Sequence, residues 1–235
     1  MKQGFVKVAA ASCAVVVADV RENTRVILET IHKMEGEGAK VMVLPELALT
    51  GYTCSDLFWQ SQMIDAAKEG LKEIADGTKE TDALIFVGLP WEQGGKLFNV
   101  AAVLCHGELL GIVPKKYLPN YNEFYELRHF TPGKEAVTTT EFFEKEVPFG
   151  MNLLFQCAEM PRLKVAAELC EDLWTPNPPS VAHALAGATV IVNLSASDEM
   201  VGKDSYRRSL VSAQSARLIC GYIYATAGEG ESTMD

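Results

Sequence analysis

Apolar residues follow two different spacings along the first third of the chain. A compact apolar run at residues 5–13 is typical of a buried strand, whereas residues 21–38 place apolar side chains three and four apart, as an amphipathic helix does. A short β-branched run at residues 41–44 predicts a second strand that ends at Pro45, and residues 63–76 repeat the helical spacing. The chain therefore begins as strand, helix, strand and helix.

The remainder of the chain continues with more strands than helices. We expect strands at residues 83–88, 98–105, 108–113, 153–157, 163–169, 189–194 and 221–225, and helices at residues 180–186 and 203–218. His106-Gly107 fits a tight hairpin turn between two of these strands. Strands that alternate with helices, with hairpins among them, favour a mixed α/β sheet covered by helices over an all-β fold or a helix bundle.

A polar and aromatic segment at residues 114–134 interrupts this alternation. It is too long for a simple connection, which makes it a candidate functional loop. No linker rich in Gly, Ser or Pro, no low-complexity tract and no fixed-period repeat divides the sequence. We therefore expect a single domain over residues 1–235.

Composition narrows the class of protein. With 235 residues, 48% apolar and 22% charged, the chain can bury a sizeable core, which excludes a disordered tail or a disulfide-stapled mini-protein. A formal net charge of −10, without a run of basic residues, argues against nucleic acid or an anionic membrane as a partner. No apolar run reaches the ~18 residues that a membrane span needs.

The cysteines argue against a metal site and against a secreted protein. They are dispersed, with no CxxC pair and no Cys/His cluster at zinc-ligand spacing. The first residues lack a secretory cleavage pattern. We therefore expect no metal, a reducing cytoplasmic location and free thiols at all six positions, Cys13, Cys54, Cys105, Cys157, Cys170 and Cys220.

Cys170 is the first candidate for chemistry, because it follows a predicted strand directly and precedes EDLW. A thiol at that point can stand on a sharp turn whose backbone N–H groups face a substrate. Only the thiolate attacks, and its unperturbed pKa is about 8.5, so the site needs a base and a cation. The usual base, histidine, has no obvious candidate here, since the four histidines fall on helices, a hairpin tip and the polar loop.

Glu46 and Lys115 share the placement of Cys170 after a predicted strand. A desolvated carboxylate can accept the thiol proton, and an ammonium can stabilise both the thiolate and a developing oxyanion. Taken singly, a charged residue near a strand end is most often solvated, and a lone cysteine most often packs as a small hydrophobe. These three residues by themselves leave the function open.

Three segments resemble the signature segments of the nitrilase, or carbon–nitrogen hydrolase, superfamily in both order and spacing. They read LPELALTGY at residues 44–52, PKKYLPNYNEFYELRHF at 114–130 and ELCEDLWTPNPPS at 168–180. Together with NLSAS at 193–197, they are most similar to the amino-terminal glutaminase domains of glutamine-dependent NAD synthetases. The resemblance covers essentially the whole chain.

The resemblance implies a nitrilase-like αββα sandwich and amide hydrolysis through a thioester. Glu46 would be the general base, Cys170 the nucleophile, and Lys115 the cation that holds the tetrahedral oxyanion. Lys116 would be a bystander, because the family pattern is Lys-x-Tyr/His-Leu. Glu123 matches the superfamily's second glutamate, which orders the lysine and the attacking water.

The glutaminase branch also implies a set of side chains around the substrate. Acidic and hydroxyl groups would receive the α-ammonium of L-glutamine, aromatic faces would line its stem, and the backbone N–H of Glu171 would assist at the oxyanion. Each has a plain structural alternative: packing for the aromatics, a surface ion pair for the glutamates and a turn hydroxyl for the serine. The side chains are Tyr52, Tyr121, Glu126, Glu171, Trp174 and Ser197.

The resemblance also sets expectations about cofactors and partners. Synthetases of this kind carry a second, ATP-using domain with an SGGxDS-type phosphate loop, and nothing in this chain matches it. We expect no cofactor for this domain, because ATP and Mg²⁺ belong to the absent synthetase domain, which would be present in the full-length protein. The last strands of the sandwich are expected to be missing, and a homo-oligomer is expected by analogy.

Three hypotheses follow for the function. The leading one is a glutaminase that releases ammonia from L-glutamine for an NAD synthetase site elsewhere. The second is a stand-alone hydrolase of small ω-amides or N-carbamoyl compounds, which would accept substrates without an α-amino group. The third, a non-catalytic oligomerisation module, is disfavoured because all three triad positions hold chemically competent residues.

Overall fold

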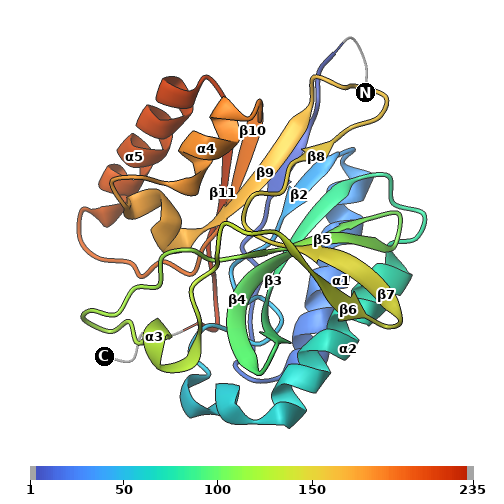
Figure 1. Ribbon diagram of the computed structural model, residues 1–235, viewed down its shortest axis with the longest axis vertical. Coiled ribbons are helices and arrows are strands. Elements are labelled where there is room, and N and C mark those ends of the chain that lie inside the picture. The colour runs from blue at the N-terminus through green and yellow to red at the C-terminus, as the bar shows by residue number, and fades with distance from the viewer. Residues whose placement is uncertain (1–3, 232–235) are drawn as a thin grey trace.

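The computed structural model describes residues 4–231 (Figure 1). Its helices in that range are α1 (Val20–Gly36), α2 (Ser61–Gly77), α3 (Glu126–His129), α4 (Pro179–Leu185) and α5 (Lys203–Leu218), with 3-10 turns η1 (Ser55–Trp59) and η2 (Cys170–Trp174). The strands are β1 (Val8–Ala10), β2 (Val41–Val43), β3 (Leu84–Gln93), β4 (Lys96–Cys105), β5 (Glu108–Pro114), β6 (Thr138–Phe142), β7 (Lys145–Phe149), β8 (Phe155–Gln156), β9 (Lys164–Leu169), β10 (Val190–Leu194) and β11 (Gly221–Ala225).

The strands of the described range form two sheets. The larger has seven strands in the order β1-β2-β3-β4-β5-β7-β6, and the smaller has four in the order β11-β10-β9-β8. Both are mixed: β1, β2 and β3 run parallel and β3, β4 and β5 antiparallel, while β9, β10 and β11 are parallel and β8 is antiparallel to β9. Figure 1 shows α1 and α2 beside the larger sheet and α4 and α5 beside the smaller one.

Strand β2 shows why the sheets are layered in this way. Successive side chains of a strand point to opposite faces, so a strand that is buried throughout must be covered on both. Val41 and Val43 pack in the apolar cluster between the sheets, whereas Met42 packs with α1 and α2 residues on the other face. A third cluster joins Ile191 of β10 to Ala184 of α4. The result is the helix–sheet–sheet–helix sandwich that the resemblance to the nitrilase superfamily implied.

Several strands differ from the predictions. The buried strand expected at residues 5–13 is reduced to the three residues of β1, and only Cys13 of that run is buried. The hairpin of β6 and β7 has no counterpart among the predicted strands, because its residues alternate exposed polar and charged side chains with few apolar ones. Strands β3 and β4 extend to a turn at Gly94-Gly95, both with positive φ, beyond the apolar runs that marked them. The strand predicted at residues 153–157 is reduced to the two residues of β8.

Two further findings bear on the sequence-based expectations. All six cysteines lie in the described range as free thiols, as expected. Among the helices of residues 4–231, none combines the length and the apolar character that crossing a membrane requires.

Candidate active site

The predicted triad comes together at the carboxyl ends of strands from both sheets. Glu46 follows β2 and Lys115 follows β5, both in the larger sheet, whereas Cys170 follows β9 in the smaller one. Their exposed fractions are 1%, 0% and 6%. The site therefore lies where the two sheets face each other, shielded from solvent.

The turn that carries Glu46 rests directly on strand β3. Leu47 has φ of 50°, and the backbone N–H of Glu46 donates to the carbonyl of Ser195 at 3.3 Å. At Gly88 of β3, a Cβ atom would overlap the backbone of Pro45 and Leu47 and lie 2.8 Å from the carbonyl carbon of Glu46. Only glycine lets the strand pass this close beneath the turn.

Lys115 lies between two buried carboxylates. Its Nζ is 2.6 Å from Oε1 of Glu46 and 2.6 Å from Oε1 of Glu126. Asn99 Nδ2 donates to both carboxylates, at 2.7 and 3.3 Å, and the Tyr52 hydroxyl donates to Glu126 Oε1 at 2.8 Å. The cluster thus satisfies the buried charges with hydrogen bonds, which a desolvated ion pair requires.

The charges in this cluster act on one another's protonation. Burial lowers the pKa of Lys115, but the carboxylates of Glu126 and Glu46 outweigh it and hold that pKa well above its ordinary value. Burial raises the pKa of Glu126 to about 7, against the opposing effect of Lys115. The ammonium is therefore fixed, and Glu126 can take up a proton near neutral pH.

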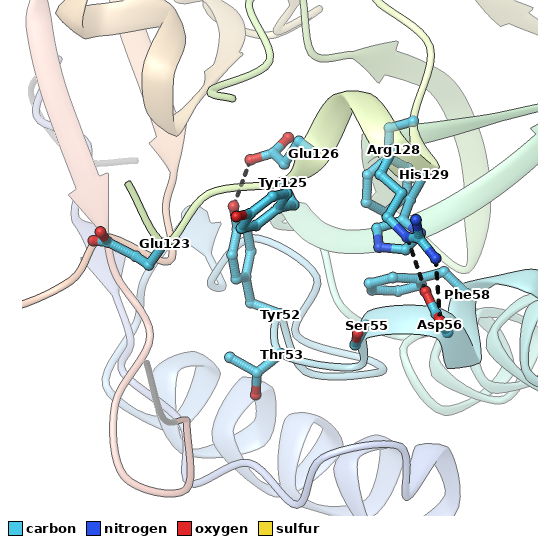
Figure 2. Close-up of a pocket in the computed structure, with 11 residues that line it drawn as sticks. Tyr52, Thr53, Ser55, Asp56, Phe58, Glu123, Tyr125, Glu126, Arg128 and His129 are labelled. Atoms are coloured by element: carbon cyan, nitrogen blue, oxygen red, sulfur yellow. Dashed lines mark hydrogen bonds and ion pairs between the residues drawn. The ribbon is translucent and has the colours of Figure 1, made fainter. Parts of the chain in front are cut away.

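The glutamate beside Lys115 is Glu126, which corrects the expectation for Glu123. Figure 2 shows Glu126 joined to Tyr52, while Glu123 points away from both. Between them the chain turns: Asn122 has φ of 51°, and the N–H of Glu126 donates to the carbonyl of Pro119 at 3.2 Å. This fold-back buries Glu126 at the start of α3 and leaves Glu123 half-buried on the lining of the cavities.

Cys170 occupies a strained turn, as its position after a strand predicted. Its φ is 39°, in the left-handed region that few residues other than glycine adopt. Its N–H donates to Oδ1 of Asn193 at 3.1 Å, and its Sγ accepts from the Ser195 hydroxyl at 3.2 Å. Burial, with the charge of Glu46, raises the pKa of the thiol to about 12, so attack requires a base to remove the proton.

Asp172 ties the nucleophile turn to the segment after Lys115. One of its carboxylate oxygens accepts the backbone N–H of Tyr117 at 2.8 Å and of Lys116 at 3.2 Å. The other oxygen accepts the N–H of Leu169, the residue before the nucleophile, at 3.0 Å. Through one buried side chain, Asp172 sets the spacing between two catalytic candidates that are 55 residues apart.

The residues predicted to surround glutamine form two groups. Tyr52 and Glu126 lie inside, in the lysine cluster, whereas Tyr121 donates to the half-buried carboxylate of Glu171 at 3.0 Å. Trp174 stacks on Tyr206, with ring centroids 5.5 Å apart, and lies beneath the ammonium of Lys203.

Two adjoining cavities reach this region from the surface. The larger, about 450 Å³, is bounded by Glu126, His129 and the η1 turn (Figure 2), and the smaller, about 260 Å³, by Ser197 and Ala196. Tyr52, Thr53 and Glu123 line both. Ala196, on the lining of the smaller cavity, donates its backbone N–H to Glu46 at 3.0 Å, and the lining residues of the two cavities do not include Glu46, Lys115 or Cys170.

Four polar residues of the site were missed by reasoning from the sequence: Asn99, Asp172, Asn193 and Ser195. Asn99 carried a usable signal, because it is the polar residue in the otherwise apolar strand FNVAAVLC. Asp172, Asn193 and Ser195 lie within segments that were quoted for their resemblance, but their contacts depend on how three separate strands meet.

Comparison with known proteins places this geometry in a family. Residues 7–229 match the family described as carbon-nitrogen hydrolase. A glutamine-dependent NAD(+) synthetase from Mycobacterium tuberculosis (strain ATCC 25618 / H37Rv) is 39% identical over 234 residues, which is 100% of this chain and 34% of that protein. The corresponding protein from Aquifex aeolicus is 32% identical, over 93% of this chain and 35% of its own length. The chain thus spans about a third of the length of these relatives.

Solved structures agree with this assignment. A glutamine-dependent NAD(+) synthetase from Cytophaga hutchinsonii superposes with a TM-score of 0.83 and 31% identity, covering 93% of this chain and 35% of the other. An amidase from Nesterenkonia sp. shares the fold, with a TM-score of 0.70 and 21% identity over 99% of this chain and 82% of its own. Because the family match extends over almost all of the described residues, the chain belongs to the carbon–nitrogen hydrolase family, as its three signature segments predicted.

Proposed function

We propose that this domain hydrolyses the side-chain amide of L-glutamine to L-glutamate and ammonia. The observation that carries the proposal is the buried cluster in which one lysine ammonium joins two carboxylates next to a cysteine on a strained turn. The 39% identity to a glutamine-dependent NAD synthetase supports glutamine as the amide.

In the first half of the reaction, Glu46 removes the proton of the Cys170 thiol, and Sγ attacks the carboxamide carbon. The new C–S bond pushes the carbonyl electrons onto oxygen, where Lys115 and the backbone N–H of Glu171 stabilise the oxyanion. Glu46 then gives its proton to the amide nitrogen. The C–N bond breaks, ammonia leaves, and the acyl group remains as a thioester on Cys170.

In the second half, a water molecule loses a proton to Glu46 and attacks the thioester carbon. The tetrahedral intermediate collapses with cleavage of the C–S bond, and Glu46 returns its proton to the departing sulfur. Glutamate is released and the thiol is restored. Glu126 keeps Lys115 in place throughout, because it is a second partner of the ammonium, at 2.6 Å, besides Glu46.

Recognition of the α-ammonium falls to Glu171 and Ser197 in this proposal. Glu126, which the sequence also suggested for that role, already holds Lys115 and is 3% exposed. Glu171 is more accessible and its carboxylate is oriented by the Tyr121 hydroxyl. A substrate without an α-amino group leaves these acceptors without a charged partner, which lowers its affinity.

We further propose that the ammonia serves a synthetase active site in a longer protein, that the domain works in the cytoplasm and that it assembles as a homo-oligomer. The relatives are NAD synthetases of which this chain matches 34% in length, and free thiols suit a reducing compartment. No cofactor is required by the reaction as written.

The test is ammonia release from glutamine, asparagine and the glutamine analogue that lacks the α-amino group, at matched concentrations. We expect kcat/KM to fall at least about 100-fold without the amino group, since unpaired buried acceptors typically cost 1–3 kcal/mol each. Asparagine should also be poor, because its shorter stem cannot bring the carboxamide to Cys170 and Lys115 together.

The other outcomes identify the alternatives. Comparable kcat/KM values for glutamine and the des-amino amide would establish the ω-amidase hypothesis instead. No turnover of any amide, together with no covalent labelling of Cys170 by a glutamine-analogue electrophile, would favour the non-catalytic module.

A further inference from the structure

Two hydroxyl groups, those of Ser195 and Tyr224, lie next to the nucleophile. Ser195 is fully buried directly after β10, and its Oγ is 3.2 Å from Sγ of Cys170. The hydroxyl of Tyr224, on the neighbouring strand β11, is 2.6 Å from the same Oγ. Neither residue has a role in the reaction described above.

The backbone around Ser195 is hydrogen-bonded to Glu46, the proposed base, and so fixes the position of the Ser195 hydroxyl relative to it. The carbonyl of Ser195 accepts the N–H of Glu46 at 3.3 Å, and the next N–H, that of Ala196, donates to Glu46 Oε2 at 3.0 Å. The N–H of Ser195 is itself bound to the carbonyl of Ala225 at 2.8 Å. One short segment therefore fixes the positions of the base and of a donor to the nucleophile.

The directions of the two hydroxyl protons follow from counting donors. Ser195 has one O–H proton, and it points to Sγ. The contact with Tyr224 must then use the phenolic proton, with Oγ of Ser195 as acceptor. Burial and the charge of Cys170 raise the pKa of Tyr224 above its ordinary value, so the phenol retains that proton.

We propose that Ser195 is a further catalytic residue, whose hydroxyl, oriented by Tyr224, donates a hydrogen bond to Sγ and stabilises the Cys170 thiolate. The stabilisation acts twice: when the thiolate attacks the amide, and when sulfur leaves the thioester. Hydrogen bonds to a charged atom in a buried site are stronger than neutral ones, so a single donor matters here. The proposal rests on the proposed amide hydrolysis.

Other groups also set the charge state of this thiol. Those that act on it from the surrounding elements are Glu46, Lys115, Glu126, Tyr52, Tyr121, Lys203 and Tyr224. Ser195→Ala removes none of these groups, but it takes away the acceptor of the Tyr224 hydroxyl. Tyr224→Phe is therefore measured beside it.

The experiment measures the rate at which iodoacetamide alkylates Cys170 between pH 6 and pH 9, followed by mass spectrometry of the peptide that contains it. We expect Ser195→Ala to be alkylated about tenfold more slowly than the parent at each pH, since loss of the donor reduces the thiolate fraction. Tyr224→Phe should give a smaller reduction. Ser209→Ala, which removes an exposed hydroxyl from α5, should match the parent.

The direction of the change separates a donor from a packing residue. Ser195→Ala opens space beside Sγ, so a purely steric role predicts equal or faster alkylation, and that result would overturn the proposal. If Ser195→Ala does not fold, the same comparison with Tyr224→Phe decides, and a parental rate there overturns it.

Ammonia release distinguishes failure of this proposal from failure of the proposed function. Slower alkylation in Ser195→Ala, with a kcat for glutamine about tenfold below the parent, supports both. Slower alkylation in a series in which even the parent releases no ammonia supports the contact with Sγ and rejects the glutaminase.

Discussion

At the scale of single residues, the site depends on one ammonium that serves two carboxylates. Lys115 is fully buried, and each of its two carboxylate contacts is 2.6 Å long. If the ammonium is removed, Glu46 and Glu126 face each other as uncompensated buried charges, which costs more than the pair contributes. In the proposed reaction, the lysine therefore maintains the shape of the site and also takes part in its chemistry.

Replacing Lys115 with alanine should lower kcat for glutamine at least about 100-fold, the scale of losing one oxyanion donor. Lys116→Ala is the matched control, because that side chain turns toward Glu135, 3.7 Å away at the surface. Steady-state ammonia release measures both. A damaging Lys116→Ala alongside a tolerated Lys115→Ala would contradict the assignment.

Replacing Cys170 with alanine should abolish ammonia release, because a methyl group cannot form the thioester. Each of the other five cysteines should tolerate alanine or serine without loss of chemistry. The measurement is kcat in the six single variants, and near-parental activity in Cys170→Ala would refute covalent catalysis at this position. The five control positions are Cys13, Cys54, Cys105, Cys157 and Cys220.

Glu126 and Glu123 provide a second matched pair. Glu126→Gln removes the charge that holds Lys115 and should lower kcat at least about tenfold, the range for a charge-assisted contact of 1.5–3 kcal/mol. Glu123→Gln, on the cavity lining, should change KM more than kcat. The reverse pattern would restore the assignment made from the sequence.

At the scale of elements, strand β3 and the turn after β2 form one unit. The absence of a side chain at Gly88 allows the strand to support the backbone that carries Glu46. The same turn is also bound to the segment after β10 of the smaller sheet, through the N–H of Glu46 and the carbonyl of Ser195, so a defect at Gly88 moves the base relative to both sheets.

Gly88→Ala should destabilise the protein by about 1–3 kcal/mol, the usual cost of overpacking, and should lower kcat as well. Gly36→Ala is the control: a Cβ there meets nothing within 4 Å, and alanine in a helix is favoured over glycine by up to about 1 kcal/mol. Urea unfolding and ammonia release on both variants check this. Equal stabilities would mean that the turn can move away from β3.

Elements with strong apolar periodicity, and the residues that directly follow them, could be predicted from the sequence. Strand β9 and the nucleophile after it were predicted together, because a buried run and the residue that ends it are both visible in the sequence. The β6–β7 hairpin was not, because its exposed faces are polar and only its pairing partners define it.

The site residues divide in the same way. The positions of Glu46, Lys115 and Cys170 could be predicted because each follows a strand. Glu123 and Glu126 lie in the segment at residues 114–134, which has no regular apolar spacing, so the sequence cannot show which of the two side chains is buried. Ser195 touches Cys170 only because β9 and β10 are neighbours in register, with Leu194 paired to Leu169. Such contacts depend on tertiary structure and have no local signal.

At the scale of the whole molecule, the buried charges of the site affect stability. Burial raises the pKa of Glu126 from its ordinary 4.5 to about 7, so between these values the folded protein binds a proton that the unfolded chain releases. The resulting stabilisation is complete below pH 4.5 and is lost as the pH rises through 7.

The free energy of unfolding of the parent should therefore fall relative to that of Glu126→Gln as the pH rises from 5 to 7, by up to about 1.4 kcal/mol per pH unit. Urea unfolding at pH 5, 6 and 7 measures the difference, and Glu123→Gln should run parallel to the parent. A difference that stays constant, or that changes in the opposite direction, would show that Glu126 does not titrate in this range.

The division of the triad between two sheets has a consequence for alignment. The base and the cation belong to one sheet and the nucleophile to the other, so the stacking of the two sheets sets the distance over which a proton passes between them. One residue of slip along a strand is about 3.3 Å, longer than a hydrogen bond. The apolar cluster between the sheets includes Val43, Phe86 and Leu169. Its packing fixes the spacing and the lateral alignment of the two sheets, and thereby the distance between the base and the nucleophile.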